Sequence, residues 1–147
     1  MKTFLLDTNV LIALFWPAHA QHSSAMKWFA SRGHQGWATC LWTQSGFIRI
    51  VSNPAFSKDA VSPLQAARVM QQNLLHEGHV YWTENRGPSD ILVQSRYLVQ
   101  NHKQVTDACL LALAEKHGGI LATFDRGIST LLSSNTRAEQ YLEILLP

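Results

Sequence analysis

The sequence of 147 residues has few cysteines, few charged residues and no long apolar run. Only 15% of the residues are charged, and the formal net charge of +2 is not gathered into a block of lysine and arginine. Such a charge permits binding of nucleic acid without requiring it. The two cysteines, Cys40 and Cys109, lie far apart in apolar stretches, which favours two buried free thiols over a disulfide.

No stretch of the sequence approaches the roughly 20 consecutive apolar residues that a membrane-spanning helix needs. The longest candidate, residues 4–16, is interrupted by Asp7, Thr8 and Asn9 and is followed by Pro17. The amino-terminal segment also lacks the basic start and the small-residue cleavage site of a signal peptide. We therefore expect a cytoplasmic protein without a membrane segment.

The apolar content of 46% is typical of a globular protein, and the length predicts a single domain over residues 1–147. Short apolar segments alternate along the chain with segments of helical periodicity. The expected strands are residues 3–6, 37–41, 79–82, 120–123 and 141–145, and the expected helices are residues 8–16, 22–31, 43–52, 63–77, 88–98 and 106–117. This alternation predicts an α/β fold, a three-layer α/β/α sandwich with a mostly parallel central sheet.

Three aspartates stand where the apolar patterns end. Asp7 follows the first expected strand directly, and Asp125 follows the fourth strand after Phe124. Asp107 comes one residue after Thr106, the expected cap of a helix whose buried face brings its start to the same edge. Ligand sites in open parallel sheets form at the carboxyl ends of the strands. We expect the three carboxylates to converge there.

Each aspartate also has a purely structural explanation. An aspartate after a strand is often only the N-cap of the next helix, and Asp107 in a first turn gains about 0.3–1 kcal/mol from the helix dipole. Their common placement at one edge favours a functional site. Gathered carboxylates without cysteine or clustered histidine favour Mg²⁺ or Mn²⁺ over zinc, and such ions suit the hydrolysis of phosphodiester bonds.

Several segments of the chain resemble motifs of PIN-domain nucleases. Residues 4–11 (Phe-Leu-Leu-Asp-Thr-Asn-Val-Leu) resemble the opening motif, residues 105–114 and 119–127 resemble the closing pair, and residues 43–54 resemble the second motif of VapC-type toxins. The matches span nearly the whole chain in the right order. The resemblance implies a parallel sheet between helices and a Mg²⁺-dependent (or Mn²⁺-dependent) endoribonuclease that acts as the toxin of a toxin–antitoxin pair. It also implies a cognate antitoxin and a homodimer.

The resemblance also implies roles for individual residues. Asp7, Asp107 and Asp125 would be the metal ligands, directly or through water. Asn9 and Thr123 would orient these carboxylates, as the groups around metal ligands usually do. Thr106 would cap its helix beside the site.

One position departs from the family pattern. The family typically has a glutamate at the start of the second-motif helix, and we assign that place to Gln44. A glutamine carbonyl can ligate Mg²⁺ or hold a metal-bound water, but it brings no charge. The alternative to the nuclease is therefore a PIN-like module that binds RNA or a partner without cleaving. Arg49 and Arg126 are either RNA-phosphate contacts or surface side chains that are solvated or form an ion pair.

Two other enzyme or signalling classes also begin with a strand that ends in aspartate. A phosphatase of the haloacid-dehalogenase type would need a second aspartate where this chain has Asn9. A response-regulator receiver would need an acidic pair at the first strand and a lysine after the last one. Neither pattern is present, so both classes are disfavoured.

Overall fold

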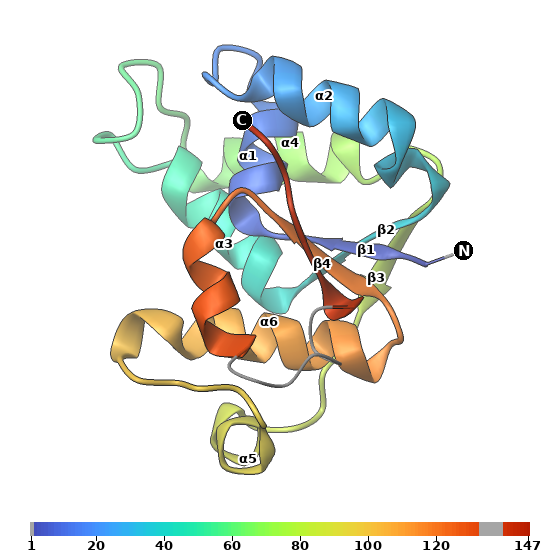
Figure 1. The fold of residues 1–147 in the computed structure, drawn as a ribbon. Helices are drawn as coiled ribbons and strands as arrows, with labels where there is room; N and C mark the ends of the chain where they lie inside the picture. Colours follow the sequence, from blue (N-terminus) through green and yellow to red (C-terminus); the bar gives the residue numbers. More distant parts are fainter. Residues whose placement is uncertain (1, 133–139) are drawn as a thin grey trace.

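The computed structural model describes residues 2–132 and 140–147. A five-stranded sheet forms the centre of the molecule, with its strands in the spatial order β3-β2-β1-β4-β5 (Figure 1). The strands are β1 (Phe4–Leu6), β2 (Trp37–Cys40), β3 (His79–Trp82), β4 (Ile120–Thr123) and β5 (Leu142–Ile144). Every neighbouring pair runs parallel. Strand β1, which the first aspartate directly follows, is the middle strand.

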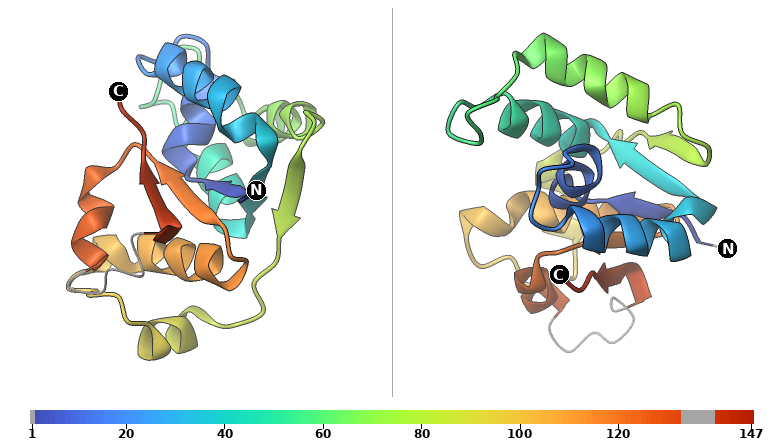
Figure 2. Two further views of the ribbon diagram at one scale, coloured as in Figure 1. Left: turned by 45° about the vertical axis from the view of Figure 1, so that its right-hand side comes forward. Right: turned by 90° about the horizontal axis from the view of Figure 1, so that it is seen from above.

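Helices cover both faces of this sheet. They are α1 (Thr8–Phe15), α2 (His22–Ser31), α3 (Leu41–Val51), α4 (Pro63–Asn73), α5 (Pro88–Gln94) and α6 (Val105–Lys116), with 3₁₀ turns η1 (Gly33–Gln35), η2 (His102–Gln104) and η3 (Arg126–Leu132). Helices α1, α2 and α4 lie on one face, and α5 and α6 lie on the other (Figures 1 and 2). Phe4 and Leu6 pack toward α1, whereas Leu5 packs toward α6. The predicted three-layer α/β/α sandwich is confirmed.

Helix α6 is the most deeply buried helix of the fold. All residues from Ala108 to Ala114 are buried, because the helix is enclosed between the sheet, α5 and η3. The sequence pattern predicted one buried face, yet alanine and leucine on every side let residues 108–114 enter the core on all sides. Gly118, with a φ of +64°, turns the chain from α6 into β4. This burial fixes the position of the first turn of α6 at the sheet edge.

Several predicted helix boundaries differ from the observed ones. Helix α3 begins at Leu41 rather than at residue 43, because Cys40 is its N-cap. Helix α5 ends at Gln94 rather than at residue 98, because Ser95 has an extended backbone with ψ of 153°. The prediction that Thr106 caps α6 is wrong: η2 leads directly into a helix that already begins at Val105.

The remaining expectations concern the thiols and the membrane. Cys40 and Cys109 are both buried free cysteines, as predicted. Among the helices of the described residues, none combines the length and apolarity that crossing a bilayer requires.

Candidate active site at the carboxyl end of the sheet

Asp7 is the most buried of the three aspartates. It directly follows β1 and is the N-cap of α1, where its Oδ1 accepts a hydrogen bond from the backbone N–H of Thr8 at 2.7 Å. Its Oδ2 accepts a hydrogen bond from the hydroxyl of Thr123 at 2.7 Å. Only 7% of the residue is exposed. The capping role and the site position therefore coexist in one side chain.

Asn9 and Thr123 join the ends of β1 and β4 into one hydrogen-bonded unit. The Thr123 hydroxyl accepts hydrogen bonds from the Asn9 amide at 3.1 Å and from the backbone N–H of Asp125 at 3.0 Å. The Asn9 carbonyl oxygen accepts one from the backbone N–H of Phe124 at 3.1 Å. These bonds fix the Asp7 carboxylate and the backbone that carries Asp125 relative to each other.

The charges of the three aspartates act on one another. Burial, followed by the charges of Asp7 and Asp125, raises the pKa of Asp107 to about 6. Burial also raises the pKa of Asp7 above its ordinary value, although hydrogen bonds from Thr123 and Thr8 oppose this rise. Asp125 is exposed, and its Oδ1 accepts a hydrogen bond from the backbone N–H of Gly127 at 2.8 Å. The three carboxylates therefore share one edge of the sheet.

This donor set fits a hard cation only in part. Carboxylate oxygens are the ligands that Mg²⁺ and Mn²⁺ prefer. Their mutual repulsion is also the kind of charge imbalance that a cation relieves. Within residues 2–132 and 140–147, however, no three histidine, cysteine or carboxylate side chains gather tightly enough to form a complete metal site. A metal at this edge would therefore have to complete its coordination with water.

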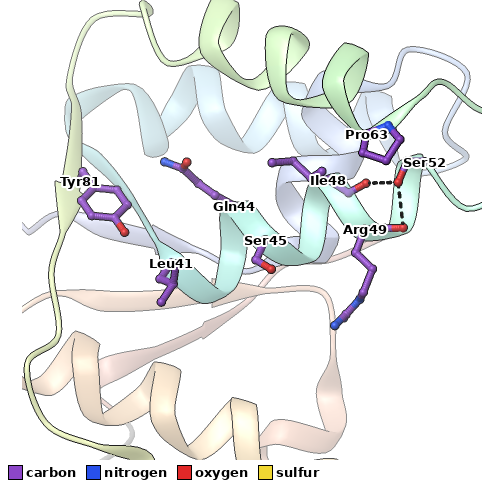
Figure 3. A pocket seen from close by; sticks show the side chains of 8 residues that line it. All are labelled: Leu41, Gln44, Ser45, Ile48, Arg49, Ser52, Pro63 and Tyr81. Atoms are coloured by element: carbon purple, nitrogen blue, oxygen red, sulfur yellow. Dashed lines mark hydrogen bonds between the residues drawn. The ribbon is translucent and has the colours of Figure 1, made fainter.

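Gln44 does not join the carboxylates. Its side-chain amide donates a hydrogen bond of 2.8 Å to the hydroxyl of Thr39 on β2. The same hydroxyl is hydrogen-bonded to the side chain of His79 on β3. Figure 3 shows Gln44 and Arg49 extending from different sides of α3. Both line an open groove of about 590 Å³ between α3, α4 and β3. The expectation that Gln44 belongs to the carboxylate cluster does not agree with this geometry.

Gly46 and the backbone carbonyl of Thr43, both on α3, meet Thr8 at the start of α1. A Cβ atom on Gly46 would lie 2.6 Å from the hydroxyl oxygen of Thr8, the residue after Asp7. Sequence reasoning missed this contact, although a glycine inside a helical pattern often marks a close approach. It also missed Cys40, at the end of β2, where the charge of Asp7 adds to burial in raising the thiol pKa.

The three remaining predicted residues are all exposed. Thr106 lies in the first turn of α6 without capping it. Arg126 follows Asp125 at the start of η3, and Arg49 lies in the last turn of α3. The two arginines therefore lie on different elements, and Arg49 lines the groove that also contains Gln44.

Comparison with known proteins assigns this arrangement to a family. The family model "PIN domain" matches residues 4–131, which includes all three aspartates. Ribonuclease VapC39 of Mycobacterium tuberculosis (strain ATCC 25618 / H37Rv) is 39% identical over 137 residues, which cover 90% of this chain and 95% of the relative. The chain belongs to the VapC type of the PIN-domain family. Ribonuclease VapC38 of the same strain is 36% identical over 142 residues, covering 97% of this PIN domain and 99% of the relative.

A solved structure supports the fold of this PIN domain independently. The crystal structure of VapBC2 from Rickettsia felis, bound to a DNA fragment from its promoter, matches with a TM-score of 0.53. The match covers 98% of this chain and 99% of the other one, at 12% sequence identity. At this identity the likeness concerns the fold alone.

Proposed function

We propose that this PIN domain is an endoribonuclease that hydrolyses RNA phosphodiester bonds with Mg²⁺ or Mn²⁺ and acts as the toxin of a toxin–antitoxin pair. The observation that carries the proposal is the meeting of Asp7, Asp107 and Asp125 at one sheet edge with unbalanced negative charge. Carboxylates whose pKa is raised by burial and by like charges, as for Asp7 and Asp107, are typical of functional sites at such an edge. The names of the similar VapC ribonucleases support the same chemistry.

Asp7, Asp107 and Asp125 would hold the metal ion. Mg²⁺ usually binds proteins through one or two carboxylates and keeps several waters, so a loose cluster suits it. When bound, such an ion activates water for attack and stabilises charge on phosphate oxygens. Asn9 and Thr123 hold the Asp7 carboxylate in one orientation through the hydrogen bonds described above.

The remaining predicted residues fall outside this metal set. Thr106 lies in the same first turn as Asp107, and Arg49 and Arg126 would contact RNA phosphates. Gln44 is left out, because its amide is engaged by Thr39. The non-cleaving alternative loses its support for the same reason: the missing charge at Gln44 does not weaken the carboxylate cluster.

The proposed partners are RNA, a cognate antitoxin and a second copy of the chain, and the proposed location is the cytoplasm. The antitoxin is supported by the structural neighbour, which is a VapBC assembly with promoter DNA. The homodimer and the location rest on the family resemblance.

The test is cleavage of total RNA by purified, antitoxin-free protein in EDTA, Mg²⁺ or Mn²⁺. We expect discrete cuts that require the metal and that disappear in Asp7→Asn. Asp59→Asn is the matched control, because Asp59 is an exposed loop residue and undergoes the same change of side chain. If folded parent protein cuts no RNA with either metal, in pools of tRNA, rRNA and mRNA, the nuclease proposal is rejected.

A further inference from the structure

Asp7 stands in a row of residues that crosses the carboxyl end of the sheet. Leu5 of β1 pairs with Ala38 of β2. The same register, two residues further on, places Asp7 beside Cys40, and Cys40 in turn pairs with Trp82 at the end of β3. Neighbouring strands lie about 4.7–4.9 Å apart, so Cys40 is one strand spacing from Asp7 and Trp82 is two.

This row faces the α6 side of the sheet. Side chains of a strand alternate between its two faces. Leu5, Cys40 and Trp82 pack in the apolar cluster that includes α6. Asp7 comes two residues after Leu5 and so lies on the same face. Its charge acts on the Cys40 thiol, where it adds to burial in raising the pKa. The end of β2 is therefore continuous with the carboxylate site.

A pocket of about 320 Å³ lies at the Cys40 and Trp82 end of this row. It is lined by the ends of β2 and β3, by Leu41 and Trp42 in the first turn of α3, and by the segment that follows β3. Its volume falls at the lower end of the roughly 300–1,000 Å³ that is typical of ligand pockets. A small group next to the carboxylates therefore has room to enter it.

Aromatic side chains form much of the pocket wall. Trp82 is 8% exposed, and its ring stacks on that of His117 with centroids 4.3 Å apart and an angle of 6° between the planes. Trp42 is partly buried and packs against the same apolar cluster. Leu41 and Tyr81, labelled in Figure 3, are 70% and 48% exposed. The pocket thus has a fixed aromatic wall and an open rim.

The charged groups beside the pocket bind one another. Glu84 and Arg86 both line it, and Nη2 of Arg86 lies 2.6 Å from the Glu84 carboxylate. Nε of Arg86 donates a hydrogen bond of 2.9 Å to the other carboxylate oxygen, which Lys116 also contacts at 3.3 Å. These charges are engaged within the protein, so a neutral flat group suits the pocket better than a phosphate does.

We propose that this pocket binds one nucleobase of single-stranded RNA, stacked on Trp42, next to the phosphate that lies at the carboxylates. This inference rests on the proposed function, because it takes RNA as the substrate. One sugar links the base of a nucleotide to its phosphate, so a pocket one to two strand spacings from Asp7 suits the base of a nucleotide at the site. Single-stranded RNA is commonly bound through bases that stack on aromatic side chains. Such stacking tolerates every base, so the pocket positions the strand without selecting its sequence.

The test compares two labelled single strands of equal length in EDTA, where the metal-dependent reaction cannot proceed. One strand is RNA of mixed sequence, and the other is its abasic form, which keeps the sugars and phosphates and lacks the bases. Loss of one base–aromatic stack weakens binding by about 5- to 150-fold. We expect Trp42→Leu to weaken binding of the RNA by this factor and to leave binding of the abasic strand unchanged. Trp42→Phe keeps an aromatic face and should retain most of the preference for RNA.

Trp16→Leu is the matched control. Trp16 is also partly buried, but it packs against Phe56, with ring centroids 5.3 Å apart, in the apolar cluster on the other face of the sheet. This variant should bind both strands as the parent does. Cooperative thermal unfolding of each variant shows that the compared proteins are folded.

Trp42→Leu that binds RNA as the parent does, or that weakens binding of both strands equally, overturns the inference. Parent protein that binds the abasic strand as tightly as the RNA also overturns it, and this result needs no variant. The cleavage assay fails separately. Parent protein that prefers RNA through Trp42 but never cuts it would reject the nuclease and keep the base pocket, and parent protein that cuts RNA without this preference would do the reverse.

Discussion

A carboxylate lies near each end of α6, and the electrostatic surroundings of the two are opposite. At its start, Asp107 faces two further aspartates, and burial together with their charges raises its pKa to about 6. Near its end, Lys116 and Arg86 contact Glu84, with N–O distances of 3.3 Å and 2.6 Å. Hydrogen bonds from Arg86 and Lys116 lower the pKa of Glu84 to about 2, although burial opposes them.

This contrast separates a carboxylate that holds the fold together from one that is available for chemistry. Glu84 has only 6% of its side chain exposed, yet its charge is balanced by two cations from different elements. Asp107 has negative neighbours, so its folded environment leaves a charge that an added cation would neutralise. Proteins keep such imbalance mainly where it serves function, and they balance buried charge elsewhere.

The largest expected effect comes from removing the charge at the start of α6. Asp107→Asn should lower metal-dependent RNA cleavage by at least about 100-fold, because substitution of a group that only orients a metal ligand already lowers activity by about 10–100-fold. Its free energy of unfolding without metal should stay equal or rise by up to about 0.5 kcal/mol, because a repulsive charge is gone. Initial cleavage rates and urea unfolding measure the two. Full activity in Asp107→Asn would show that the charge of Asp107 is not needed for cleavage.

A variant at Glu84 tests whether this carboxylate stabilises the fold. Glu84→Gln should lower the free energy of unfolding by about 2–3 kcal/mol, because Arg86 and Lys116 lose a charged hydrogen-bond partner. Cleavage per folded molecule should stay near that of the parent. Urea unfolding followed by tryptophan fluorescence gives the stability, with Glu77→Gln, at an exposed loop residue, as the control. Equal stability of the two variants would show that the ion pairs contribute nothing.

The pH dependence of stability also tests the contribution of Glu84 to the fold. The pKa of Glu84 is about 2 in the folded protein and about 4.5 in the unfolded chain. Its contribution is therefore fully present above about pH 4.5 and is lost as the pH falls toward about 2, because the unfolded chain takes up the proton first. The stability difference between parent and Glu84→Gln should be constant from about pH 7 to pH 5 and should shrink below that. A difference that grows on acidification would reverse the assigned sign.

The sequence predicted the start of α6 far better than its end. Strand periodicity located β1 and β4, and the aspartates that follow them had to meet at one edge of a parallel sheet. No pattern joins Glu84 to Lys116, because that pairing depends on how the segment after β3 passes beneath α6. Ion pairs between distant segments form through tertiary packing, which has no local period in the sequence.

The same limit explains the position of Gln44. Motif order places the second-motif helix correctly, yet the side of a helix that faces the site changes by about 200° over two residues. The observed contacts with Thr8 fall on Gly46, two residues after Gln44, and on the backbone carbonyl of Thr43. The packing of α3 determines which of its sides faces the site, and the order of motifs in the sequence does not specify that side.

The smallest expected effect is that of Gln44→Glu. If the charge of the site resides in Asp7, Asp107 and Asp125 alone, a carboxylate at Gln44 lies on the wrong side of α3 to add to it. The metal-dependent cleavage rate and the metal concentration for half-maximal rate should then stay within about twofold of the parent, as for a surface change. The Gln72→Glu variant, at an exposed residue of α4, controls for added negative charge. A tenfold rise in rate or in metal affinity, absent from Gln72→Glu, would mean that the side chain at position 44 turns toward the carboxylates when metal binds. The proposed metal site would then include a fourth side chain, from α3.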